Sequence, residues 1–164
     1  MLKLGDFILT AGGGKLMAPL KAGLGLLEPE YRKLDWQPFH MAVVIRAGQS
    51  PLIFEGWFPR ARVVPLSIHQ DYRVYHWFSQ PLARDKVDEF VASRLGAFYD
   101  PACYLWTIMA WAMKLPIPRI NDRFFTCWEL AADFALWFGE PWHDMYTWPL
   151  ITDFLEAVGE IGED

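Results

Sequence analysis

The stretch Phe124-Phe125-Thr126-Cys127-Trp128-Glu129-Leu130 decides how the rest of the chain is interpreted. Its cysteine follows residues of strand or turn character and opens an apolar run, 128–138, that suits a buried helix. The first turn of a helix presents unpaired N–H groups and the positive end of the helix dipole, which stabilise a thiolate. Cys127 is therefore a candidate nucleophile, although a lone cysteine before a helix is more often a small buried apolar side chain.

The length and composition of the chain are those of one domain. With 164 residues it can bury a stable core without staples, so we expect a single domain over 1–164 with a frayed acidic tail at 160–164. Hydrophobic residues make up 53% and aromatic residues 16%, including nine Trp. This excess predicts either an aromatic core or an aromatic surface that meets a ligand, a lipid or a protein partner.

The charge pattern argues against one class of partner. The formal net charge is −5 at pH 7, and the Lys and Arg residues are scattered without a basic stripe. Because nucleic-acid binding needs concentrated positive charge, no nucleic-acid partner is expected.

Cysteine usage and hydropathy predict no cofactor, metal or membrane segment. Cys103 and Cys127 stand alone without ligand-spaced Cys or His pairs, so no zinc site is expected, while one disulfide between them stays open. The N-terminus meets an acidic residue and a glycine cluster before any signal-like apolar region. The longest apolar stretch, 102–116, is too short to cross a bilayer. We expect no signal peptide and a cytoplasmic location, or a phage-associated one if the protein is viral.

Strand patterns dominate the first half of the chain and helical patterns the second, which predicts an α+β fold. The expected strands are 5–10, 39–46, 52–57, 62–66 and 71–78, with a polar loop at 28–38. The expected helices are 84–95, 104–115, the Cys127 helix and 152–158, and residues 15–27 form either a short helix or a mobile apolar loop.

A cysteine nucleophile needs a base and a third group that orients the base. Four histidines are available. His40 begins a well-formed strand, which is a rigid place for a base, whereas His69 lies in a polar turn and His143 in an aromatic segment. His76 sits in a strand of uncertain facing. A histidine at the start of a strand is still more often structural than catalytic.

Five short motifs follow one another along the chain. They are Gly5-Asp6, His40-x-Ala42-x-Val44, Phe54-Glu55-Gly56, Tyr99-Asp100 and Phe125-Thr126-Cys127-Trp128-Glu129-Leu130. Together they resemble the circularly permuted papain-like hydrolases, namely the YaeF/YiiX-like amidases, kin to the NlpC-type cell-wall peptidases and to lecithin retinol acyltransferase. The resemblance spans about 5–138 and implies a permuted papain-like α+β fold. In that fold a small antiparallel sheet or barrel packs against helices, and the nucleophile lies at a helix N-terminus.

The resemblance implies three catalytic roles. Cys127 matches the nucleophile, His40 the base, and Glu55 the residue that orients the imidazole. If strands 39–46 and 52–57 pair, His40 and Glu55 lie toward the same end of the hairpin, a few residues out of register, so that a bulge or a neighbouring strand could bring them together. The alternative for Glu55 is an exposed strand carboxylate.

Three further residues are expected to bind substrate. Trp128 replaces the small residue common after the nucleophile and would fill part of the pocket or wall one side of it. Tyr99 matches part of a Tyr-Asp pair that shapes the site, and Trp57 shares a strand face with Glu55. Glu129, in the first helical turn, is expected to be structural because it favours the helix dipole.

The implied reaction is acyl transfer through a thioester on an amide bond, a peptide bond such as that of a cell-wall peptide, or a lipid acyl bond. An alternative is a catalytically inert binding or structural module of the same fold, in which an aromatic surface meets a protein partner. A third and weaker interpretation is a metal-dependent hydrolase that uses His40, Glu55 and His76.

Overall fold

The computed structural model of the chain describes residues 1–11, 22, 29–99, 124–142 and 151–160. Within them the fold is α+β, with a five-stranded antiparallel sheet of order β4-β3-β2-β1-β5 and a two-stranded parallel sheet, β6-β7. The strands are β1 (Phe7–Thr10), β2 (His40–Arg46), β3 (Leu52–Glu55), β4 (Arg62–Pro65), β5 (Tyr72–Tyr75), β6 (Phe98–Tyr99) and β7 (Phe124–Phe125). The helices are α2 (Pro29–Lys33), the 3₁₀ helix η1 (Leu66–Ile68), α3 (Arg84–Arg94), α5 (Cys127–Trp137) and α6 (Ile151–Ala157).

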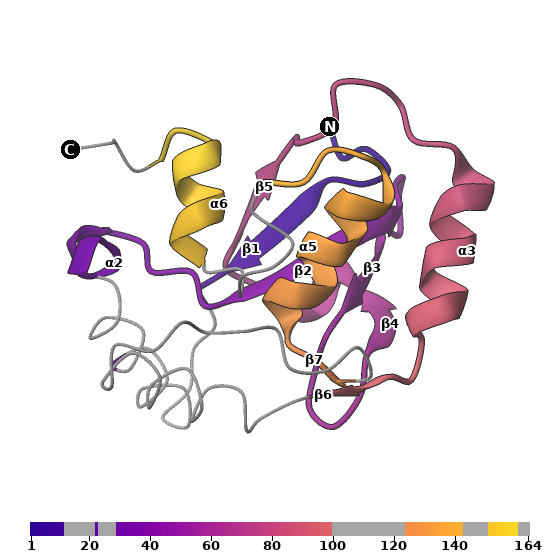
Figure 1. Cartoon of the computed structure of the whole chain (residues 1–164), viewed down its shortest axis with the longest axis horizontal. Coiled ribbons are helices and arrows are strands. Elements are labelled where there is room, and N and C mark those ends of the chain that lie inside the picture. The colour runs from indigo at the N-terminus through magenta and orange to yellow at the C-terminus, as the bar shows by residue number, and fades with distance from the viewer. Residues whose placement is uncertain (12–21, 23–28, 100–123, 143–150, 161–164) are drawn as a thin grey trace.

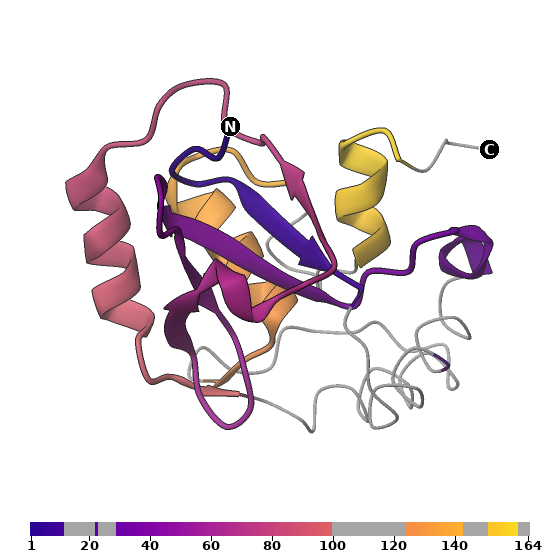
Figure 2. The same ribbon diagram turned by 180° about the vertical axis from the view of Figure 1, so that it is seen from behind.

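Both faces of the central strand β2 are buried, because successive side chains point to opposite sides of the sheet. Met41 and Val43 belong to a large core on the helix side, while Ala42 and Val44 join a smaller core on the other side. Leu66 of η1 belongs to the smaller core. The short helix η1 itself lies over the sheet in the view from behind (Figure 2). This two-sided burial explains why β2 is almost continuously apolar.

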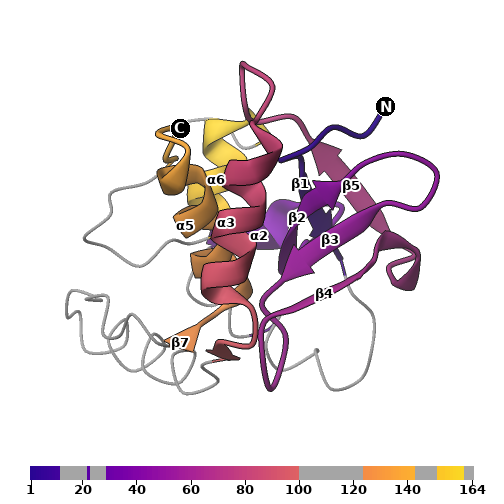
Figure 3. The same ribbon diagram turned by 90° about the vertical axis from the view of Figure 1, so that its right-hand side faces the viewer.

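The helix α5 packs against β2 and β3 and contributes more buried residues to the large core than any other described element. Figure 1 shows it lying across the sheet, and Figure 3 shows α3, α5 and α6 together on one side of the five strands. Phe134 of α5 meets Phe90 of α3 edge to face, with ring centroids 5.1 Å apart. Many aromatic rings of the described residues thus lie in the core, and the N-terminus of α5 is fixed against the sheet.

The expected strands and the helices near 84–95, 128–138 and 152–158 are confirmed, with bounds that shift by a few residues. The expected loop at 28–38 is wrong in part, because it contains the helix α2. Pro29 stands at the first helical position, where its missing N–H costs nothing. The basic residues Arg32 and Lys33 lie in the last turn, where they interact favourably with the helix dipole.

Several expectations lie outside the described residues. They concern the segments 15–27 and 104–115, the partner cysteine Cys103, and the residues Asp100 and His143. Among the residues that the structure does describe, no helix is long and apolar enough to span a bilayer.

Candidate active site

A capping box fixes the start of α5. Thr126 is the N-cap: its Oγ1 accepts from the backbone N–H of Glu129 at 3.3 Å, and its own N–H donates to Glu129 Oε2 at 2.9 Å. The two bonds satisfy donors that a helix start would otherwise leave unpaired. Glu129 thus has the structural contacts expected for it, and Cys127 stands at the first position of a well-defined helix.

The end of β3 lies directly against the nucleophile candidate. A Cβ at Gly56 would be 3.0 Å from the carbonyl oxygen of Thr126 and 3.1 Å from both the Cα and the N of Cys127. Contacts that short are tighter than most that real Cβ atoms make, so a side chain at Gly56 would have to push the backbone of Thr126 and Cys127 away. The residue before it, Glu55, is therefore delivered next to the N-terminus of α5.

Sheet register brings His40 and Glu55 together without any irregularity between them. Ala42 and Glu55 are directly opposite in the β2–β3 pair, and His40 lies two positions from Ala42 on the same face. Nε2 of His40 donates to Oε2 of Glu55 at 2.8 Å, and both side chains are buried. Neither a bulge nor a neighbouring strand is needed at this end, because the register shift of the pair lies between Val44 and Arg46. The alternative of an exposed carboxylate is wrong, since Glu55 is fully buried.

His40 also interacts with the side chain of Cys127 through a hydrogen bond and through charge. Since Nε2 faces Glu55, Nδ1 is the ring atom left for the sulfur. Burial disfavours the imidazolium, but the charge and hydrogen bond of Cys127, followed by those of Glu55, outweigh it and raise the pKa of His40 to about 9. The arrangement favours a thiolate–imidazolium pair near neutral pH.

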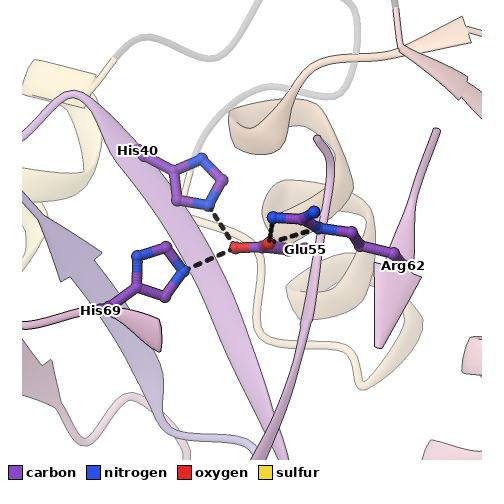
Figure 4. Close-up of polar contacts among 4 residues, drawn as sticks. All are labelled: His40, Glu55, Arg62 and His69. Carbon is purple, nitrogen blue, oxygen red and sulfur yellow. Dashed lines mark hydrogen bonds and ion pairs between the residues drawn. The ribbon is translucent and has the colours of Figure 1, made fainter. Parts of the chain in front are cut away.

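Glu55 is held by two more residues that sequence reasoning did not assign to the site. Figure 4 shows His40 and His69 both pointing at Oε2, with Arg62 at the other oxygen. His69 Nε2 lies 2.9 Å from Oε2, and Arg62 Nε donates to Oε1 at 2.8 Å. Burial would raise the pKa of Glu55, but the hydrogen bonds of His40 and His69, the charge of His40 and the Arg62 bond together hold that pKa well below its usual range.

The two missed residues differ in how they could have been found. Arg62 stands directly opposite Glu55 in the β3–β4 pair, so a hairpin drawn between the two expected strands would have paired them. His69 follows η1, and no periodicity in the sequence connects it with a carboxylate fourteen positions earlier.

The three expected substrate-binding residues lie at different depths. The ring of Trp57 meets that of His40 edge to face, with centroids 5.1 Å apart, and so forms one wall of the histidine cluster. Trp128 is only 3% exposed and belongs to the large core. Tyr99 of β6 pairs with Phe125 of β7, and Phe125 stands two residues before Cys127. Their contact with a substrate stays a prediction.

The remaining described histidine stands elsewhere. Nδ1 of His76 lies 2.7 Å from Oδ1 of Asp6, so the structure does not bring together the metal-ligand set His40, Glu55 and His76 that the third interpretation used. A different set converges instead: ligand atoms of His40, Glu55 and His69 all lie within 4.8 Å of one another.

Comparison with known proteins supports the fold only. No family model and no curated protein sequence matches the chain. Among solved structures, the chain is similar to the metalloprotein YiiX from Escherichia coli O157:H7, a DUF1105 protein, with 15% sequence identity and a TM-score of 0.53. The match covers 81% of this chain, which spans 64% of the length of that structure. The fold is thus YiiX-like, while the permuted papain-like assignment stays a prediction.

Proposed function

We propose that the chain is a cysteine-dependent hydrolase or acyltransferase that acts through a thioester on an amide, peptide or lipid acyl bond. The observation that carries this proposal is the series of buried contacts from Cys127 to His40 to Glu55 at the start of α5. Nucleophile, base and orienting carboxylate are in the order that covalent acyl transfer requires.

The contacts support the following steps. The Cys127 thiolate attacks the substrate carbonyl carbon, and the positive end of α5 stabilises the oxyanion that forms. His40 gives its Nδ1 proton to the leaving group as the C–N or C–O bond breaks, leaving an acyl thioester. Water, or another acceptor, then attacks the thioester, and His40 takes a proton from the attacking molecule. The bond to sulfur breaks and Cys127 is released as the thiolate. Glu55 keeps the imidazole ring in place throughout.

Trapping of the acyl enzyme tests the proposal. Purified protein is mixed with p-nitrophenyl esters of short and long acyl chains and with N-acyl amides, quenched in acid, and mapped by mass spectrometry. We expect an added acyl group on the Cys127 peptide that is absent in Cys127→Ser, together with turnover of at least one acyl class. Absence of acylation across this panel, with unmodified Cys127, would favour the inert binding module, whose exposed apolar residues include Phe58, Leu95 and Phe98.

The similar structure is described as a metalloprotein, and His40, Glu55 and His69 bring three possible ligand atoms together in this chain. Three N and O ligand atoms suit zinc in number. However, Oε2 of Glu55 accepts from both imidazoles, and Arg62 already holds Oε1. A divalent ion bound at Glu55 would be repelled by the Arg62 guanidinium on the same carboxylate, which offsets part of the attraction of Glu55. The residues fit a hydrogen-bonded cluster better than a metal site.

A further inference from the structure

The two carboxylate oxygens of Glu55 are hydrogen-bonded by three side chains. Oε2 lies between the Nε2 atoms of His40 and His69, at 2.8 and 2.9 Å, and Oε1 accepts from Arg62. An ionised carboxylate can only accept hydrogen bonds, so each of the two imidazoles must carry a proton on Nε2. The contact therefore fixes His69 as a donor toward Glu55, whichever charge its ring bears.

The charged groups around Glu55 alternate in sign. The proposed Cys127 thiolate faces the His40 imidazolium, which faces the Glu55 carboxylate, which faces the Arg62 guanidinium. These four charges sum to zero. A hydrogen bond from His69 favours the ionised form of Glu55 and so keeps the carboxylate as the anion that pairs with His40.

The ring of His69 is mounted rigidly. Its backbone N–H donates to the carbonyl of Leu66 at 3.0 Å, and Leu66 is anchored in the smaller core. The rings of His40 and His69 stack at 5.6 Å with an interplanar angle of 29°, and Trp57 meets His69 edge-on at 6.3 Å. In contrast, the Arg62 side chain is 40% exposed, so its contact with the carboxylate is more open to water.

We propose that His69 is a positioning residue that holds Oε2 of Glu55 against His40, and thereby holds His40 against Cys127. The inference rests on the proposed cysteine function. The terminal torsion of a glutamate is soft, so without His69 the carboxylate can rotate toward Arg62 and away from the His40 ring. With His69 in place, Oε2 is held by hydrogen bonds from the Nε2 atoms of both imidazoles.

Two substitutions of similar size test the role of the N–H donor. His69→Gln keeps a side-chain amide donor, whereas His69→Met fills similar space without one. The rate of iodoacetamide alkylation at Cys127 is measured from pH 5 to pH 9, with peptide mapping to separate Cys103. At pH 6 we expect His69→Met to alkylate about tenfold more slowly than wild type, because a one-unit upward shift of the thiolate titration has this effect. His69→Gln should recover most of the rate.

The matched control is His76→Gln, which changes a histidine held by Asp6 outside the cluster and should leave the profile unchanged. Equal profiles for wild type and His69→Met would overturn the inference, as would equal losses in His69→Met and His69→Gln. If wild type itself titrates as an ordinary thiol, the proposed function fails and the inference with it. Stoichiometric zinc in the purified protein that both His69 variants lose would also overturn it, because the three residues would then be metal ligands.

Discussion

Nε2 of His40 donates to Oε2 of Glu55 at 2.8 Å, inside the protein, from the first residue of β2 to the last residue of β3. Two ionisable groups are rarely buried together unless each stabilises the charged form of the other. Here Cys127 and Arg62 extend the pair at its two ends, so the charges are matched along the whole series. The predictions below follow from this arrangement.

The charge of His40 should persist well above neutral pH. Its pKa is raised to about 9, and the Cys127 contacts are the largest of the causes that raise it. NMR of labelled imidazoles should show His40 protonated at pH 7 and titrating near pH 9. In Cys127→Ser the titration should move to lower pH, since the thiolate charge is gone. An unchanged titration in that variant would contradict the Cys127–His40 contact.

The stability of the protein should depend on Glu55 in acid. A carboxyl group whose pKa is lowered by folding stabilises the native state above its unfolded pKa, near 4.5, and loses this contribution as the pH falls below that value. Glu55→Gln should therefore be less stable than wild type at pH 7 in urea unfolding, and the difference should shrink as the pH falls from 5 to 3. Glu160→Gln, on the surface, is the control. A difference that stays constant with pH would contradict the prediction.

Gly56→Ala should disturb the nucleophile through direct contact. The new Cβ would meet the backbone of Thr126 and Cys127 at 3.0 to 3.1 Å, and a backbone contact cannot be relieved by a rotamer change. We expect a loss of about 1–3 kcal/mol in the free energy of unfolding, as for other overpacked sites, and slower alkylation of Cys127.

The control for Gly56→Ala is Gly48→Ala, where a Cβ meets nothing within 4 Å and only the backbone conformation is strained. It should leave the pH profile of Cys127 alkylation unchanged. Equal effects of the two substitutions on Cys127 would show that the close approach at Gly56 has no special role.

Thr126→Ala should weaken the start of α5. It removes the side-chain acceptor for the Glu129 N–H, and loss of such an N-cap costs about 1 kcal/mol. Thermal unfolding followed by circular dichroism would measure this loss, with Ser79→Ala as a control for an exposed hydroxyl that bonds a surface carboxylate. If both variants unfold at the wild-type temperature, the capping box contributes nothing to stability.

Much of the fold was accessible from the sequence because its signals are local. The apolar run in 39–46 predicted β2, and the period of two along a strand put His40 and Ala42 on one face. Only the register, in which Ala42 stands opposite Glu55, was beyond local reasoning. Register depends on how the whole sheet packs against α5 and η1, and this packing cannot be predicted from any single segment.

The site was harder to predict than the fold for the same reason. One of the two residues that were missed, His69, reaches Glu55 because η1 folds back over the sheet through Leu66, a tertiary contact. The helix α2 was missed because the segment 28–38 is polar, although Pro29 suits the start of a helix. The substrate, the single-domain organisation and the catalytic roles stay predictions.

The most direct test of the central claim is the pH dependence of iodoacetamide alkylation at Cys127 in wild type and in His40→Gln, with Cys103 resolved by peptide mapping. A Cys127–His40 ion pair predicts rapid alkylation of the wild type well below pH 8.5, the ordinary titration point of a cysteine thiol. In His40→Gln this rapid alkylation below pH 8.5 should disappear. Slow labelling that follows an ordinary thiol titration and is indifferent to the substitution would contradict the account and leave Cys127 as a buried structural residue.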